Sequence, residues 1–258
     1  MTIIDTHAHV DQLEDIDGAL SRAWAAGVTD IVAVSVDLAS MHKILDLAAA
    51  PEPVGASPKI HPALGIHPGM VKPEAQAEAF DFIKANIHKA IAVGETGLDY
   101  WYKWVRKDEV ERKKQKDSFE FHLNVAKEHD LPIIIHSRGA WRDCLAMAKA
   151  ADVRRALFHW YSGPVDILEQ VLSAGYYVST SPSVAYSPES RAAMGHAPLE
   201  RILIETDAPV RYKDGDTDFL AEPKDVVRTL KALSSLKNSD EQAVLTRVNQ
   251  NAKDFFKI

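Results

Sequence analysis

The chain has 258 residues, of which 46% are hydrophobic and 26% charged, and its formal net charge is −7. This composition excludes a disordered chain. The negative charge and the lack of a long basic run argue against a protein that binds nucleic acid by broad neutralisation of phosphates. A polyanionic substrate would have to be met by local charges, such as bound metal ions.

The ends and the cysteine content of the chain bear on its location. No apolar run approaches the roughly 20 residues that span a bilayer, and the N-terminus lacks the features of a secretory signal. The single cysteine, Cys144, cannot form an internal disulfide, and we expect a buried, inert thiol within an apolar helix. We therefore expect a cytoplasmic protein with no membrane contact. The oligomeric state is open, and a monomer is compatible with the sequence.

Short apolar runs alternate with stretches of helical periodicity along the chain. The predicted strands, in chain order, are Thr2–Thr6, Asp30–Ser35, Ile60–Ile66, Ala90–Glu95, Pro132–His136, Ala156–His159, Tyr176–Ser179 and Ile202–Thr206. The predicted helices are Asp17–Ala26, Ser40–Ala50, Pro73–His88, Asp108–His129, Ala140–Ala150, Val165–Ala174, Pro188–Met194, Pro223–Leu236 and Ser239–Phe256. Several strands are near-continuous apolar runs, which is typical of parallel strands covered on both faces.

This alternation predicts a fold. Eight strand–helix units indicate a parallel sheet that closes into a (β/α)8 TIM barrel, for which about 250 residues is a typical length. The sequence shows no linker or internal repeat, so we expect a single domain over residues 1–258. An open doubly wound sheet is the alternative, but its G-x-G-x-x-G signature after the first strand is absent.

Metal-ligand residue types gather where the predicted strands end. His7 and His9 lie two apart in extended chain, so both imidazoles can face one point. Singly, each such residue has an ordinary explanation as a cap, a core histidine or a turn former. Together they converge, because the carboxyl ends of barrel strands meet at one mouth. Four histidines and two carboxylates there predict two divalent metal ions, with Zn²⁺, Mg²⁺ or Mn²⁺ all acceptable. The predicted ligands are His7, His9, Glu95, His136, His159 and Asp207.

The segments around these residues resemble the TatD family of metal-dependent deoxyribonucleases, whose fold is an amidohydrolase-like barrel. The matching segments are Ile4–His9, Ala63–Pro68, Val93–Tyr100, Leu131–Arg138, Phe158–Gly163, Ile204–Pro209 and Asn251–Ala252. The resemblance implies that His7, His9 and Asp207 hold one metal, and that Glu95 bridges to a second metal on His136 and His159. It also implies hydrolysis of DNA phosphodiester bonds by a metal-activated water, as a 3′–5′ exonuclease on single strands.

Other residues are candidates for catalysis and substrate binding. Asp207 is our candidate for positioning the water and accepting its proton, and Glu95 for bridging the metals. Arg138 could clamp a phosphate, or could instead form a salt bridge at a helix start. Trp101, Trp104, Trp160 and Tyr161 could stack on bases, or could be core or rim packing. His67 and Glu205 match family motif positions in or beside the site.

Two departures from the family pattern put the substrate in doubt. The segment Val210–Glu222, which we expect to be a loop, is rich in Asp, and Trp160 stands where a small residue is common. The main alternative is therefore an amidohydrolase, lactonase or phosphoesterase for small molecules. Many such enzymes use a bridging lysine on strand four, where this chain has Glu95. A non-catalytic metal-binding scaffold is a remote alternative, and no ligand is missing to support it.

Overall fold

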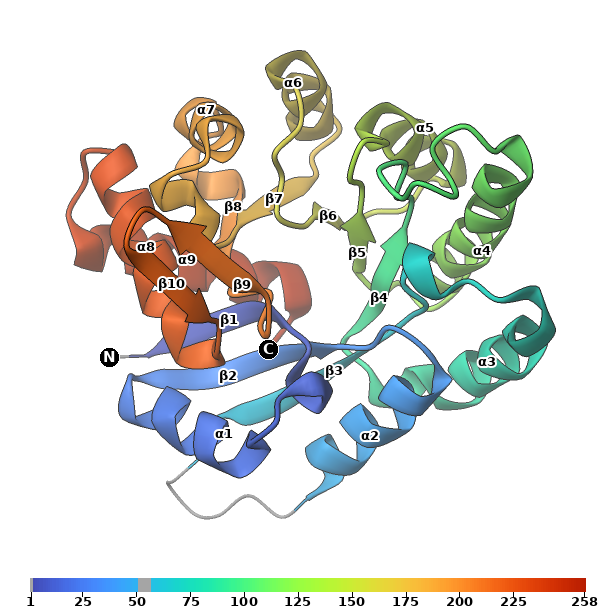
Figure 1. The fold of residues 1–258 in the computed structure, drawn as a ribbon, viewed down its shortest axis with the longest axis horizontal. Helices are drawn as coiled ribbons and strands as arrows, with labels where there is room; N and C mark the ends of the chain where they lie inside the picture. The colour runs from blue at the N-terminus through green and yellow to red at the C-terminus, as the bar shows by residue number, and fades with distance from the viewer. Residues whose placement is uncertain (1, 51–56) are drawn as a thin grey trace.

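The computed structural model describes residues 2–50 and 57–258. Its main sheet has eight strands, all parallel, in the order β1 to β8, and Figure 1 shows them at the centre of the molecule with the helices around them. The strands are β1 Ile3–Ala8, β2 Val28–Val34, β3 Lys59–Leu64, β4 Ala92–Gly97, β5 Ile133–His136, β6 Ala156–Phe158, β7 Tyr177–Thr180 and β8 Ile202–Ile204. The predicted (β/α)8 barrel is confirmed.

The α-helices follow the strands in the predicted order. They are α1 Ile16–Ala25, α2 Leu38–Ala49, α3 Pro73–Asn86, α4 Glu109–Glu128, α5 Trp141–Ala151, α6 Val165–Ser173, α7 Pro188–His196, α8 Val226–Leu236 and α9 Glu241–Phe256. Short 3-10 helices are η1 Val10–Gln12, η2 Pro68–Met70, η3 Ile87–Lys89, η4 Pro182–Ala185, η5 Leu199–Arg201 and η6 Pro223–Asp225. Aspartates cap several helices, for example Asp108, whose carboxylate accepts hydrogen bonds from the first turn of α4. In the described residues, no helix has the length and apolarity needed to cross a membrane.

The first and last strands close the barrel mainly through residues at their carboxyl ends. Ala8 and Ala208 form a parallel bridge, and the backbone N–H of His9 donates to the carbonyl of Ala208 at 2.7 Å. Below them, the buried carboxylate of Asp5 accepts hydrogen bonds from the backbone N–H and the hydroxyl of Thr206. Side-chain and loop contacts therefore hold β1 beside β8 where a regular ladder is short.

Apolar residues form two cores, one on each face of the sheet. One lies between the strands and the outer helices. The other fills the barrel and consists of Ile4, Val32, Val34, Ala63, Ala92, Ile134, Leu157 and Leu203, with Ala252, Phe255 and Phe256 of α9 packed against them. Asn249 and Asn251 of α9 donate to the carbonyls of Thr2 and Ile202, at the amino-terminal ends of β1 and β8, so α9 closes the barrel interior from that side. The opposite, carboxyl-terminal mouth is left for the candidate site.

The segment predicted as a loop, Val210–Glu222, contains a hairpin instead. Its antiparallel strands are β9 Arg211–Asp214 and β10 Thr217–Leu220, joined by a two-residue turn in which Gly215 has φ +55°. Tyr212 is buried, and its hydroxyl donates to the carbonyl of Thr206 at 2.8 Å. The loop expectation was wrong because the apolar anchors Tyr212 and Phe219 are separated by charged residues that form the exposed turn.

Candidate active site

All six predicted metal ligands gather at the carboxyl-terminal mouth of the barrel. His7, Glu95 and His136 belong to strands, and His159 directly follows β6. Five of the six residues are buried, and the side chain of His136 is 14% exposed. The barrel therefore brings residues from five separate segments of the chain to one point, as expected for strand ends that converge.

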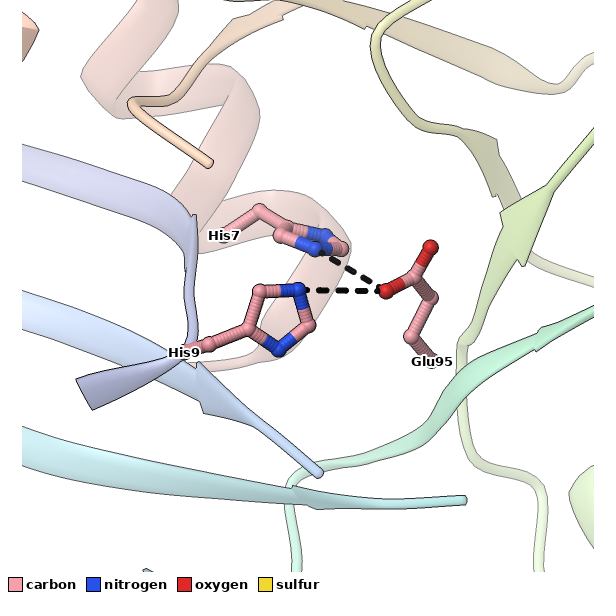
Figure 2. Close-up of side chains that lie close together, drawn as sticks. All are labelled: His7, His9 and Glu95. Atoms are coloured by element: carbon pink, nitrogen blue, oxygen red, sulfur yellow. Dashed lines mark ion pairs between the residues drawn. The ribbon is translucent and has the colours of Figure 1, made fainter. Parts of the chain in front are cut away.

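Glu95 lies between two pairs of histidines. Its Oε2 atom lies 3.5 Å from Nε2 of His7 and 3.3 Å from Nε2 of His9, as Figure 2 shows for these two side chains from the first strand end. Its Oε1 atom lies 2.7 Å from Nδ1 of His136 and 2.8 Å from Nε2 of His159. Each carboxylate oxygen thus faces its own set of imidazole nitrogens, which is the arrangement of a carboxylate that can bridge two cations.

Asp207 completes the group around the first pair. Its Oδ1 atom lies 3.3 Å from Nε2 of His7 and 3.4 Å from Nε2 of His9. Within the described residues, this oxygen and both ring nitrogens of His7 are buried without a hydrogen-bond partner. Buried polar atoms are rarely left unsatisfied in native proteins. A cation bound between Nε2 of His7 and Oδ1 of Asp207 would satisfy these two atoms, so the residues present fit a metal ion.

In three of the four histidines, the ring nitrogen that points away from Glu95 lies near a hydrogen-bond acceptor. The outer N–H of His9 donates to the carbonyl of Val34 at 3.1 Å. The outer nitrogen of His136 lies 2.9 Å from Oδ2 of Asp99, and that of His159 lies 3.3 Å from Oε1 of Glu205. Such outer partners fix the tautomer, so that the inner nitrogen keeps its lone pair for a metal.

The carboxylates of this group require positive charge nearby. Burial lowers the pKa of His9, but the nearby carboxylates of Asp207 and Glu95 outweigh it and raise that pKa to about 10. Burial raises the pKa of Glu95, but the surrounding histidines hold it well below its ordinary value. Without a cation, protons on the histidines balance the carboxylates. A metal ion must displace those protons, so metal affinity falls as the pH falls.

A comparison with known proteins decides the family. The sequence model of the family described as TatD related DNase matches residues 4–257 of this chain. The chain belongs to this family. YjjV of Escherichia coli K12, named an uncharacterized metal-dependent hydrolase, is 29% identical over 265 residues and covers 99% of this chain and 98% of its own length. The uncharacterized metal-dependent hydrolase TatD of Mycobacterium tuberculosis is 28% identical, with coverages of 97% and 96%.

Solved structures of TatD proteins agree. A crystal structure of YjjV superposes with a TM-score of 0.86 at 26% identity, covering 99% of this chain and 98% of that one. A TatD-family hydrolase from Entamoeba histolytica superposes with a TM-score of 0.83 at 22% identity, covering 98% and 97%, and shows the same fold. The protein is accordingly a metal-dependent hydrolase of the TatD family, with the fold that its sequence predicts.

The residues predicted to contact substrate lie in different surroundings. The side chain of Arg138 is 46% exposed, and its Nη2 atom lies 2.8 Å from Oδ2 of Asp99. Nε2 of His67 lies 3.7 Å from Oε1 of Glu95, beside the second histidine pair. Burial lowers the pKa of His67 to about 3 despite that carboxylate. Glu205 lies behind His159, where Ser179 donates to it at 2.5 Å.

The two aromatic residues after β6 differ in their exposure. Trp160 is half-buried, and its indole N–H donates to the hydroxyl of Ser183 at 2.8 Å. Tyr161 is fully buried, and its hydroxyl donates to the carbonyl of Pro164 at 2.8 Å. Tyr161 is therefore a core residue in this structure, whereas Trp160 is packed against the core and is only partly buried.

Several residues beside the site have backbone conformations that are unusual for their residue type. Asp207 and Trp160 have φ values of +50° and +39°, a region that residues other than glycine rarely adopt. Gly97 has φ +137°, and a Cβ atom there would lie 2.1 Å from the carbonyl oxygen of His136. Strained backbone of this kind is concentrated at functional sites. Only a glycine at position 97 lets β4 approach β5 at this point.

Asp99 is the residue of the site whose role the sequence did not predict. It is buried, and its Oδ2 atom contacts both His136 and Arg138. Its position, just beyond a strand end and three residues before Tyr102, was visible in the sequence. What the sequence lacked was the orientation of the His136 ring, which decides which carboxylate faces its outer nitrogen.

Proposed function

We propose that this TatD-family protein is a deoxyribonuclease that hydrolyses phosphodiester bonds of single-stranded DNA from the 3′ end, with two divalent metal ions. The observation that carries the proposal is the position of Glu95, whose two oxygens face two separate pairs of histidines. The family description, TatD related DNase, supports a nucleic-acid phosphodiester as the bond that is cleaved.

The ligand assignment follows from these contacts. His7, His9 and Asp207 would hold one ion, and His136 and His159 would hold the other. The carboxylate of Glu95 would bridge them. Zn²⁺, Mg²⁺ and Mn²⁺ all suit a site that mixes imidazole and carboxylate ligands. The unpartnered Nε2 of His7 and Oδ1 of Asp207 support this assignment, because a cation between them would supply the partner that they lack.

Bound there, the two ions would supply Lewis-acid activation of water and neutralise charge on the phosphoryl oxygens. The chain supplies the proton acceptor. Burial raises the pKa of Asp207, but the neighbouring imidazoles of His7 and His9 outweigh it and hold that pKa far below its ordinary value, so the carboxylate is ionised. Its Oδ1 atom faces the centre and can accept the proton of the attacking water.

Arg138 is placed to hold a phosphate. Its Nε and Nη2 atoms are both engaged by Oδ2 of Asp99, and its Nη1 atom makes no hydrogen bond within the described chain. The half-exposed guanidinium can therefore present Nη1 to a phosphate oxygen while Asp99 keeps it oriented. The salt bridge and the phosphate contact, which the sequence left as alternatives, are compatible with each other.

The test is nucleotide release from labelled single-stranded DNA, in EDTA and after addition of Mg²⁺, Mn²⁺ or Zn²⁺. We expect no release in EDTA, restored release with at least one of the ions, and a loss of about a thousandfold or more in Asp207→Asn. A strand with a blocked 3′ end should be resistant. Asp218→Asn, on the exposed hairpin, is the matched control and should retain full activity.

One outcome would remove the DNA assignment but keep the site. If the protein binds two metals per chain and yet releases no nucleotide from any strand, the substrate is a small ester, lactone or phosphodiester. Binding of no metal by a folded chain would contradict the proposed site itself.

A further inference from the structure

Two exposed tryptophans stand on the loop between β4 and α4, next to the candidate site. Trp101 is 66% exposed and Trp104 is 56% exposed. The ring of Tyr102 stacks on that of Trp104, with centroids 4.3 Å apart and planes 19° from parallel. We call Trp101, Tyr102 and Trp104 the aromatic shelf. Large aromatic rings left in water at one place are unfavourable unless something covers them, and they commonly mark a binding surface.

The aromatic shelf is held in position by the backbone around it. A Cβ atom at Gly139 would lie 2.4 Å from Cδ1 of Trp101, and one at Gly69 would lie 2.7 Å from the hydroxyl oxygen of Tyr102. The two rings therefore rest directly on glycine backbone. In addition, the backbone N–H of Trp101 donates to Oδ1 of Asp99 at 2.8 Å. Rings fixed in this way lose little conformational freedom when a ligand stacks on them.

The shelf is continuous with the candidate metal ligands. The ring of Tyr102 lies 6.4 Å from that of His67, edge to face, and His67 lies beside Glu95. The guanidinium of Arg138 lies 5.3 Å from the Tyr102 ring and 6.0 Å from the Trp101 ring. A ligand on the shelf would therefore lie beside the cation that we assign to a phosphate, and one side chain away from the metal ligands.

We propose that the aromatic shelf binds unpaired nucleobases of the substrate strand, so that the enzyme holds single-stranded DNA by stacking. This inference rests on the proposed function and names the feature of the substrate that is recognised. Base-on-aromatic stacking tolerates every sequence and needs a base with a free face, which an unpaired strand provides. The chain has a net charge of −7 and no long basic run, so it can make few contacts to phosphates. Base stacking would supply the binding energy that phosphate contacts would otherwise give.

The test is the affinity of the Mn²⁺-loaded protein for a single-stranded hexanucleotide with phosphorothioate linkages, which resist hydrolysis, measured by fluorescence anisotropy. We expect Trp101→Ala and Trp104→Ala each to weaken binding about tenfold. An abasic strand of the same length should bind the wild type weakly and be insensitive to both substitutions. Trp101→Phe, which keeps an aromatic face, should retain most of the affinity. Trp24→Ala, at a 37% exposed position on α1, is the matched control and should bind as the wild type does.

The salt dependence gives a second readout. With about two phosphates neutralised, one by the metal ions and one by Arg138, affinity should fall only about sevenfold between 50 and 200 mM salt. A fall of about a hundredfold would show that phosphate contacts dominate and would overturn the proposal. So would equal affinity for the abasic and base-bearing strands, or no binding of either.

The outcomes separate the shelf from the proposed function. If the wild type releases nucleotides but the shelf substitutions change neither affinity nor KM, the shelf proposal fails and the nuclease proposal stands. If the strand binds through the shelf but no nucleotide is ever released, the nuclease proposal fails and the shelf stands.

Discussion

At the scale of single residues, the candidate site depends on which nitrogen each imidazole turns inward. The carbonyl of Val34 and the carboxylate of Glu205 accept from the outer nitrogens of His9 and His159. Asp99 has the same relation to His136 and is itself anchored by Arg138. Because these acceptors are fixed by the barrel, the inner nitrogens converge on Glu95 without further adjustment.

This arrangement gives Asp99 a testable role as a positioning residue. In Asp99→Asn, the acceptor for the outer nitrogen of His136 loses its charge, and an amide can also present the wrong atom to it. We expect the ion assigned to His136 and His159 to lose affinity by about ten- to a hundredfold, while the ion assigned to His7, His9 and Asp207 keeps its affinity. Titration of metal-free protein against a chromogenic chelator measures both steps.

Asp143→Asn is the matched control, since Asp143 accepts a hydrogen bond from Tyr100 on the same loop but contacts no proposed ligand. Unchanged affinity for both ions in Asp99→Asn would show that the barrel alone orients His136. The metal titration does not depend on Arg138 holding a phosphate, so the two roles of Asp99 are measured separately.

At the scale of elements, a buried histidine joins helix α4 to the loop after β3. Nε2 of His122 accepts from the backbone N–H of Ile66 at 3.1 Å, and its Nδ1–H donates to the carbonyl of Ser118 at 2.7 Å. Burial lowers the pKa of His122 from 6.5 to about 4. The neutral ring thus fixes the segment that leads into His67.

The direction of that pKa shift predicts acid sensitivity. Because the folded-state pKa lies below the unfolded one, protons bind the unfolded chain more readily between pH 6.5 and 4. As the pH falls from 6.5 to 4, the free energy of unfolding should fall by at most about 3.4 kcal/mol from this residue. Urea unfolding in EDTA at several pH values measures it. We expect His122→Gln to be less stable at pH 7 but to show a flatter pH profile.

The exposed His129→Gln, at the end of the same helix, controls for the substitution itself. A His122→Gln profile as steep as that of the wild type would assign the acid sensitivity to other groups.

The helices and strands also show how much of the fold the sequence pattern predicted. Predicted strands and helices agree with the structure to within about two residues, apart from Pro223–Leu236, whose first turn is the separate 3-10 helix η6. The strong alternation of apolar runs explains this success. The hairpin β9–β10 was missed because its two apolar anchors are isolated among charges. The unpredicted partners, Asp99 behind His136 and Gly139 under Trp101, depend on ring orientations that only tertiary packing sets.

At the scale of the whole molecule, the barrel explains why six dispersed residues form one site. Strand ends far apart in sequence meet at one mouth, and α9 plugs the other end with Phe255 and Phe256. Sequence reasoning could place all six residues at that mouth because parallel strands leave no other choice. Residue types and spacing alone did not place Glu95 between the two histidine pairs. The family resemblance implied that position, which depends on the path of β4 across the mouth.

The most direct test of the two-metal site is a crystal structure of the Mn²⁺-loaded protein with anomalous scattering recorded at the manganese edge. We expect two peaks about 3.5–4 Å apart, each about 2.2 Å from a different oxygen of Glu95. His7, His9 and Asp207 should also coordinate one ion, and His136 and His159 should coordinate the other. A single peak, or two peaks that Glu95 does not bridge, would contradict the account.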